Sequence, residues 1–115
     1  MTDEVALREE LARLRDILGA QLVAYLATKR DALIVDAWVE GSQHPTDRIW
    51  QLLKFSFQMA TIVASATDRE TAQAWFTEAN PLLDGFSPAQ VIRNEPPGGS
   101  LWVRLAHTAV DFTVE

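Results

Sequence analysis

The sequence predicts an all-α protein, folded as a compact bundle of about six helices. Apolar residues recur at three- and four-residue spacing, several segments begin with helix-capping patterns, and no segment alternates long enough to indicate a sheet. The only β-leaning runs are residues 33–35 and 112–114. With 115 residues, 48% of them hydrophobic, the chain is large enough to bury the core of one compact domain.

The first two expected helices lie on either side of Gly19. Leu7, Leu11, Leu14 and Leu18 follow one another at four- and three-residue spacing, which is one stripe of an amphipathic helix. A second helix is expected over residues 21–28. The leucine stripe is too short for an independent coiled coil, which favours packing within the chain. A homodimer that uses this stripe stays open as the alternative.

A third helix is expected over residues 31–40, with Gly41 just past its end as the C-terminal stop. After a loop, Thr46 can cap a long helix that runs to about Ala66, with Asp47 well placed in its first turn. This long segment is apolar on most sides, which is typical of a central helix that several others cover.

The C-terminal half begins with a capping-box pattern, in which Thr67 is followed three residues later by Glu70. This pattern predicts a helix over residues 67–78, which Pro81 prevents from continuing. A second capping box is formed by Ser87 and Gln90, with a proline at the first helical position.

Residues 95–99 (Glu-Pro-Pro-Gly-Gly) form the clearest hinge of the chain. Ser100 can cap a last helix, which is expected to end near Asp111. Residues 112–115 would then form a short, partly apolar tail.

The composition indicates a function without catalysis. The chain has no cysteine, so disulfides and thiolate metal sites are excluded, and His44 and His107 lie in different segments without metal-ligand spacing. No nucleophile elbow, phosphate-binding loop or dinucleotide fingerprint occurs. We therefore expect a protein that is not an enzyme and needs no metal or cofactor.

The net charge of −6 is unevenly distributed. Residues 67–115 hold seven acids and three bases, net −4, whereas residues 18–66 hold four of each. No apolar run approaches the roughly 18 residues of a membrane span, and the N-terminus is acidic, so we expect no membrane association and a cytoplasmic location.

Two sequence patterns carry the functional interpretation. Residues 22–45 (LVAYLATKRDALIVDAWVEGSQHP) read as a helix-turn-helix whose second helix ends W-x-x-G, with a proline following. The apolar residues expected to hold its two helices together are Leu22, Val23, Leu26, Leu33, Val35 and Trp38. A plain helical hairpin with a C-terminal glycine is the alternative interpretation.

The second pattern is QAWFTEANPLLDGFSPAQVIRN, residues 73–94. Trp75 lies near the end of one helix, Asn80 and Pro81 break it, Leu83 sits in the turn, and a new helix starts at residues 87–88. As structural elements alone, the apolar residues of this segment would belong to the core: Trp75, Phe76, Leu82, Leu83 and Phe86.

Taken together, the two patterns resemble the Xre/MbcA/ParS-type antitoxins over nearly the whole chain. The resemblance implies a helix-turn-helix-like region, residues 1–66, and a toxin-binding region, residues 67–115, within one compact domain. It implies that the chain binds and neutralises a RES-domain toxin that consumes NAD, with the C-terminal region occluding the active-site cleft. The implied toxin-binding residues are Trp75, Asn80, Pro81, Leu83, Arg104, Asp111, Phe112, Val114 and Glu115.

The resemblance further implies that Phe112, Val114 and Glu115 insert into the toxin, with Arg104 and His107 on the supporting helix. Asp111 and Glu115 would imitate the charge of the NAD pyrophosphate in a basic pocket. The alternative is a tail that packs on its own domain.

A dimeric helix-turn-helix transcriptional regulator is the alternative function. Its DNA-binding residues would be Lys29, Arg30, Gln43 and Arg48. The expected reading helix argues against this function, because its exposed candidates are Asp31, Ala32, Ile34 and Asp36. Carboxylates repel the phosphate backbone, and alanine or isoleucine can contact only a thymine methyl group.

Overall fold

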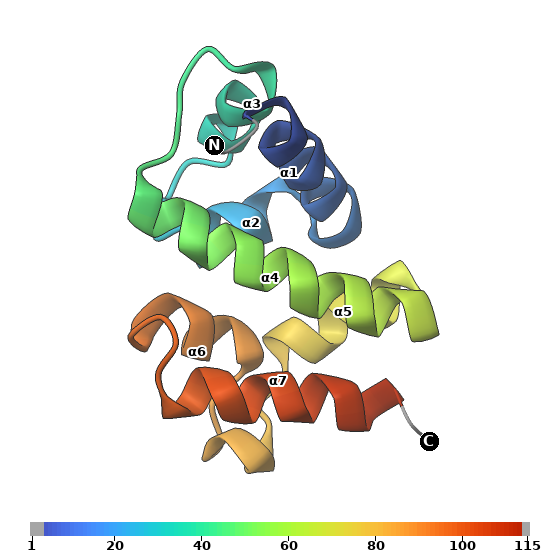
Figure 1. Cartoon of the computed structure of the whole chain (residues 1–115). Coiled ribbons are helices and arrows are strands. Elements are labelled where there is room, and N and C mark those ends of the chain that lie inside the picture. The colour runs from blue at the N-terminus through green and yellow to red at the C-terminus, as the bar shows by residue number, and fades with distance from the viewer. Residues whose placement is uncertain (1–3, 114–115) are drawn as a thin grey trace.

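The computed structural model describes residues 4–113, and all regular secondary structure in this part of the chain is helical, which confirms the predicted all-α class. Its elements are α1 (Glu4–Leu18), α2 (Ala20–Leu26), α3 (Leu33–Glu40), α4 (Asp47–Ala66), α5 (Arg69–Thr77), the 3-10 turn η1 (Pro81–Leu83), α6 (Pro88–Asn94) and α7 (Ser100–Thr113) (Figure 1). None of the described helices is both long enough and apolar enough to cross a membrane.

Helix α4 is the central element, as its apolar sequence predicts. The hydroxyl of Thr46 accepts a hydrogen bond from the Ile49 backbone N–H and so caps its first turn. In Figure 1 the helix runs between an N-terminal layer of α1, α2 and α3 and a C-terminal layer of α5, α6 and α7. It buries residues toward both layers, among them Leu53 and Met59.

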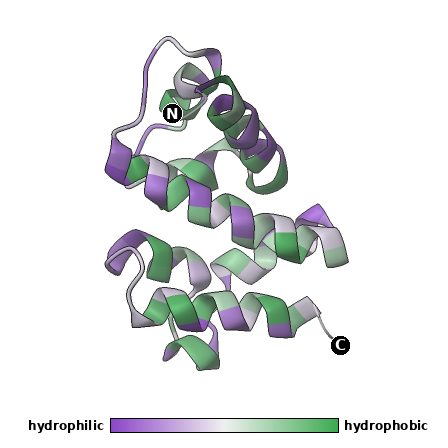
Figure 2. Cartoon of the chain, viewed as in Figure 1, coloured by the Kyte–Doolittle hydropathy of each residue, from purple (hydrophilic) through white to green (hydrophobic). Residues whose placement is uncertain are grey.

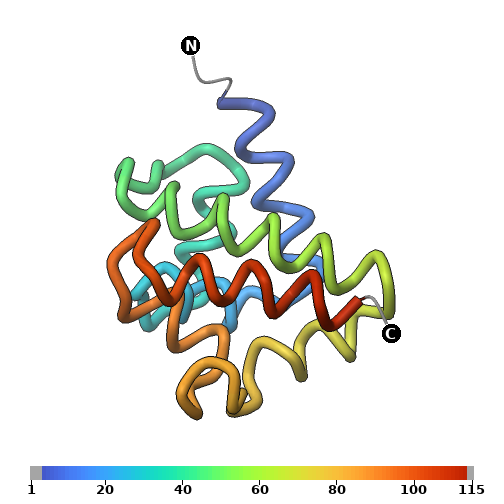
Figure 3. Tube along the Cα trace, turned by 60° about the horizontal axis from the view of Figure 1, so that its bottom comes forward, coloured from blue at the N-terminus to red at the C-terminus, as the bar shows by residue number. Residues whose placement is uncertain are grey.

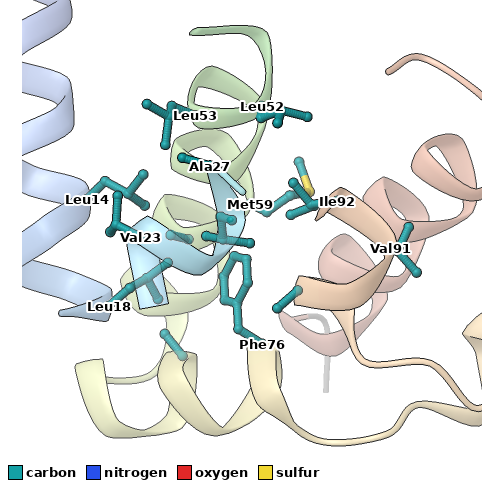
Figure 4. Packing of buried hydrophobic residues seen from close by; sticks show 14 of the residues in the cluster. Leu14, Leu18, Val23, Ala27, Leu52, Leu53, Met59, Phe76, Val91 and Ile92 are labelled. Carbon is teal, nitrogen blue, oxygen red and sulfur yellow. The ribbon is translucent and has the colours of Figure 1, made fainter. Parts of the chain in front are cut away.

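One hydrophobic core is shared by the two halves of the chain. Figure 4 shows Met59 of α4, Phe76 of α5 and Ile92 of α6 close to Val23 of α2. Arg93 joins the same layers at the surface, because its Nη1 donates to the Tyr25 carbonyl at 3.1 Å and its guanidinium lies 4.3 Å from the Tyr25 ring centroid.

The predicted leucine stripe of the first helix packs within the chain. Leu11, Leu14 and Leu18 belong to the hydrophobic core, and Leu7 is buried as well. Packing inside one copy therefore accounts for this stripe. Figure 2 shows the corresponding separation of apolar and polar positions along the helices.

Two boundary signals of the sequence are confirmed in atomic detail. Ser87 and Gln90 form a reciprocal capping box, in which the Ser87 hydroxyl accepts from the Gln90 N–H at 3.2 Å and the Gln90 side chain accepts from the Ser87 N–H at 2.9 Å. Gly41 ends α3 in the left-handed conformation, with φ +85°.

The predicted capping box at Thr67 is wrong. Asp68 is the N-cap of α5, and its Oδ1 accepts from the Thr71 backbone N–H at 2.7 Å. Hydrogen bonding from Thr71, first from its backbone, lowers the pKa of the Asp68 carboxyl. Thr67 instead ends α4, because its hydroxyl donates to the Val63 carbonyl at 2.6 Å.

The last helix extends further than the sequence indicates. Helix α7 continues through Thr113 and therefore includes Asp111 and Phe112, which were expected to lie at its end and in a tail. The Thr113 hydroxyl donates to the Val110 carbonyl at 2.8 Å within this last turn. Val114 and Glu115 lie outside the described residues.

The helix-turn-helix-like region differs from the expected unit in its connection. Residues 27–32 separate α2 from α3, which is longer than the three- or four-residue turn typical of the motif. Leu33 was expected to lock the two helices together, but it is 70% exposed. It is the first residue of α3, and the helix is held instead through Val35 and Trp38, which are buried.

Candidate functional site

A groove in the C-terminal half collects most of the residues that the resemblance implies for toxin binding. It is a hollow of about 410 Å³ between the end of α5, the η1 turn and α7, and we call it the C-terminal groove. Its lining consists of Thr71, Ala74, Trp75, Glu78, Ala79, Asn80, Pro81, Leu82, Thr108, Asp111 and Phe112. Five predicted residues therefore come together there, namely Trp75, Asn80, Pro81, Asp111 and Phe112.

The wall formed by η1 is a closed turn organised by Asn80. The Asn80 side-chain oxygen accepts from the Leu82 N–H at 2.9 Å, and its backbone N–H donates to the Phe86 carbonyl at 3.0 Å. Its backbone carbonyl accepts from the Gly85 N–H at 3.0 Å. With Pro81 at the first position, the 3-10 turn has a fixed start.

Adjacent leucines of this turn have opposite environments. Leu83 is fully buried, whereas Leu82 is 59% exposed and lines the groove. Phe86, on the same turn, is 48% exposed. Leu82 and Phe86 were expected in the core, and this expectation is wrong because the turn closes over Leu83 alone. Leu83 can position the turn but cannot itself contact a partner.

The opposite wall is formed by the end of α7. Phe112 packs against Trp75, with ring centroids 6.4 Å apart and planes at 48°, and it keeps 40% of its surface exposed. Trp75 in turn meets Phe76 edge to face at 5.0 Å. Phe112 therefore packs on its own domain and still offers an apolar surface to the groove.

Trp75 is only 7% exposed, and its indole N–H is buried without a hydrogen-bond partner among the described residues. It forms the floor of the groove, and a partner would contact it only at its edge.

Arg104 lies beside the groove. Its Nη1 donates to Asp84 Oδ1 at 3.2 Å, which ties α7 to the left-handed residue that ends η1. Both side chains are about half exposed or more, so this ion pair contributes little to stability. The Arg104 guanidinium is therefore accessible at the surface beside the turn. Glu115 and Val114, the remaining predicted residues, lie outside the described residues.

Exposed apolar side chains concentrate in the same half of the chain. Among the described residues, seven large hydrophobic side chains are exposed, and five of them belong to the C-terminal half, namely Leu82, Phe86, Val103, Val110 and Phe112. Two of them, Leu82 and Phe112, line the groove, and exposed apolar residues that gather at a hollow mark an interaction surface.

Three of the four candidate DNA-binding residues lie together in the structure. Lys29, Arg30 and Gln43 line a second hollow of about 440 Å³, which we call the basic hollow, together with Asp31, Leu33, Ile34 and Ala37. Arg48 does not line it and lies exposed in the first turn of α4.

The two carboxylates of the expected reading helix are engaged within the chain. Asp36 forms an ion pair with Arg15 of α1 at 2.8 Å. Asp31 accepts from the Leu33 backbone N–H at 2.9 Å and precedes α3. Asp36 is therefore directed at α1, and the accessible face near the basic hollow is mainly apolar, with Leu33 its most exposed side chain.

The sequence interpretation did not foresee a third and larger hollow, of about 840 Å³. It is lined by residues of α2, α5 and the start of α6, including Gln21, Tyr25, Gln73 and Gln90. No predicted site residue lines it. The end of α1 also contributes to it, through Leu18, and the hollow forms only where these separate segments meet, so no local signal in the sequence indicates it.

The two histidines lie in different elements and have different surroundings. His44 Nδ1 lies 2.6 Å from Glu4 Oε1, whereas His107 is exposed on α7. Within residues 4–113, no group of three or more histidine, aspartate or glutamate side chains is arranged to hold a metal ion.

Comparisons of this chain with protein-family models, with curated proteins and with solved structures found no match.

Proposed function

We propose that this chain is an antitoxin that binds and neutralises a RES-type, NAD-consuming toxin through its C-terminal groove. The observation that carries the proposal is the groove itself, where Leu82 and Phe112 expose apolar surface on opposite walls. The resemblance of residues 73–94 to the toxin-binding module supplies the class of partner. Five residues implied by that resemblance line this one hollow.

The chemistry of the groove suits a protein partner. Its rim carries Glu78 and Asp111 around apolar walls, and its floor is the edge of a buried tryptophan. Aromatic anchors surrounded by polar residues are typical of binding hot spots. The acidic rim would complement a basic pocket such as one that accepts the pyrophosphate of NAD. Occlusion of that pocket is the proposed means of inhibition.

The first experiment identifies the partner. The tagged full chain is purified from its native cells at moderate salt, and the co-purifying proteins are identified by mass spectrometry. The proposal expects a RES-domain protein, whose NAD consumption stops when the purified chain is added. A stable partner of another class, or a RES-domain protein that keeps its activity in the complex, would contradict it.

A matched pair of substitutions then tests the groove. Leu82→Glu places a charge on the groove wall and should weaken the complex by about 30-fold or more, the effect expected at a binding hot spot. Leu33→Glu makes the same change at the still more exposed Leu33 of α3 and should leave the complex intact. Equal affinities for the two variants would place the interface elsewhere.

The acidic end of α7 is tested separately. Asp111→Lys combined with Glu115→Lys should strongly reduce inhibition if these carboxylates occupy the basic pocket of the toxin. Retention of full inhibition would confine the interface to the apolar walls and refute the proposed imitation of pyrophosphate.

The DNA-binding regulator is a second candidate, favoured by the basic hollow. Lys29 and Arg30 stand next to each other in the α2–α3 connection, with Gln43 on the same hollow. If the chain binds DNA there, Lys29→Glu with Arg30→Glu should abolish a gel shift and leave toxin binding unchanged. The absence of any salt-sensitive DNA binding by the unaltered chain would eliminate this function.

A further inference from the structure

Helix α7 presents two exposed valines to solvent on the side opposite its buried face. The buried face consists of Trp102, Leu105, Thr108 and Ala109. The opposite side carries Val103, His107 and Val110 at spacings of four and three residues, and we call these three residues the α7 outer stripe. Val103 is 55% exposed and Val110 is 48% exposed, although both are aliphatic.

The position of the helix in the fold leaves this stripe open. Figures 1 and 3 place α7 at the outside of the molecule, where it packs against α4 and the η1 turn. The C-terminal groove adjoins the side of α7 that carries Thr108, Asp111 and Phe112. The groove and the stripe are therefore neighbouring surfaces that meet at Asp111.

Opposite charges lie along one edge of the stripe. Arg104 and Asp111 are seven residues apart, which is two helical turns and about 10 Å along the axis. Both side chains are exposed, and within the described part of the chain the Arg104 guanidinium is paired with the exposed carboxylate of Asp84.

This arrangement is complementary to a second copy of itself. When two identical helices pair in antiparallel orientation, each edge meets the same edge of the partner with its direction reversed. Arg104 of each copy then stands beside Asp111 of the other, and Val103 stands near Val110. Such an interface is isologous, so every favourable contact occurs twice.

We propose that the chain self-associates through antiparallel pairing of the α7 outer stripe, with Arg104 and Asp111 forming two reciprocal ion pairs across the interface. In a parallel pairing each edge meets the opposite edge of the partner, so Arg104 and Asp111 would lie beside the valine edge and form no ion pair; the charges therefore favour the antiparallel arrangement. The paired surface is short, which makes the dimer weak and dependent on concentration. The inference goes beyond the proposed function and needs no toxin.

The experiment is sedimentation velocity on the full chain, from low micromolar to several hundred micromolar concentration. The unaltered protein should shift from monomer toward dimer over this range. Arg104→Glu alone and Asp111→Arg alone should each weaken the dimer by about tenfold, since each variant replaces two attractive pairs by two repulsive ones. A monomeric protein throughout the range would overturn the proposal.

Mixing the two variants tests directly whether Arg104 of one chain meets Asp111 of the other. In a mixed dimer, the glutamate introduced at position 104 of one chain meets the arginine introduced at position 111 of the other. The unaltered Asp111 of the first chain also meets the unaltered Arg104 of the second. The mixture should therefore recover the affinity of the unaltered protein, whereas each variant alone should dimerise about tenfold more weakly. Failure of the mixture to recover, or unaltered affinity in either variant alone, would show that these edges do not meet.

Two controls separate the interface from effects within one chain. Asp84→Asn removes the internal partner of Arg104 and should leave the dimer unchanged. Leu33→Glu should also leave it unchanged, because α3 lies in the other layer. Loss of the dimer on Leu33→Glu would place the interface on α3 and refute the proposal. Because this assay contains no toxin, its failure is distinguishable from a failure of the antitoxin function.

Discussion

Leu82 and Leu83 allow the same chemical change to be made at two adjacent positions with opposite environments. Leu83 is fully buried beneath the η1 turn, and Leu82 is 59% exposed. Truncation of a buried leucine to alanine typically costs between about 2 and 5 kcal/mol, because apolar burial is lost and a cavity remains. We expect about 3 kcal/mol for Leu83→Ala, because a surface turn can partly collapse around the lost side chain.

Leu82→Ala should change the free energy of unfolding by less than about 0.5 kcal/mol, as is usual for exposed positions. Urea unfolding followed by tryptophan fluorescence measures both variants, since Trp75 lies close to this turn in the sequence and the groove. With an m-value of about 1.5 kcal/mol/M, the Leu83 variant should unfold at a urea concentration lower by about 2 M.

Equal midpoints for the two variants would refute the reasoning, because they would mean that the turn does not depend on its buried leucine. The pair also separates stability from binding. Leu82→Ala should weaken partner binding in a protein of normal stability, whereas Leu83→Ala should lower both.

The remaining predictions concern helix ends. Gly41→Ala should lower the free energy of unfolding by about 1–2 kcal/mol, because alanine is strained at φ +85° and its Cβ would displace the guanidinium of Arg8. In an Arg8→Ala background this loss should be smaller by about 0.5 kcal/mol. A double-mutant cycle of urea unfolding measures the difference. An unchanged cost in that background would assign the whole effect to backbone strain. Asp68→Ala should lower the melting temperature at neutral pH, because it removes the N-cap oxygen that accepts from the Thr71 backbone N–H. Asp68→Asn keeps an oxygen at this position and should retain most of the stabilisation. Since the folded pKa of Asp68 is lowered, its stabilisation is present above the unfolded carboxyl pKa and is lost as the pH falls through the folded pKa. The difference in melting temperature between the unaltered protein and Asp68→Ala should therefore shrink in strongly acidic solution; a constant difference across pH would show that the charge of Asp68 contributes nothing.

The sequence predicts helix ends correctly where the contacts that determine them lie within a few residues of one another. The Ser87–Gln90 capping box, the glycine stop at Gly41 and the Thr46 cap are such cases, and each forms as the sequence predicts. At residues 67–68 two adjacent side chains could both cap a helix. The choice falls on Asp68 because the Thr67 hydroxyl bonds back to Val63 of the preceding helix.

Exposure was less predictable than helix formation. Leu33, Leu82 and Phe86 look like core residues by type, but their surroundings depend on how distant segments pack. The groove illustrates the same limit. The sequence places Trp75 and Asn80 around one turn, but Asp111 and Phe112 join them only because α7 returns beside η1. No spacing along the chain contains that information.

The core that the two halves share has a thermodynamic consequence. Because Val23 and Phe76 are buried in one cluster and Arg93 bonds to Tyr25, neither half retains its interior when the other unfolds. A ligand that binds only the folded state stabilises every part that unfolds with its site. Occupation of the C-terminal groove should therefore slow amide hydrogen exchange in α1 and α2, on the far side of α4, as well as in α7.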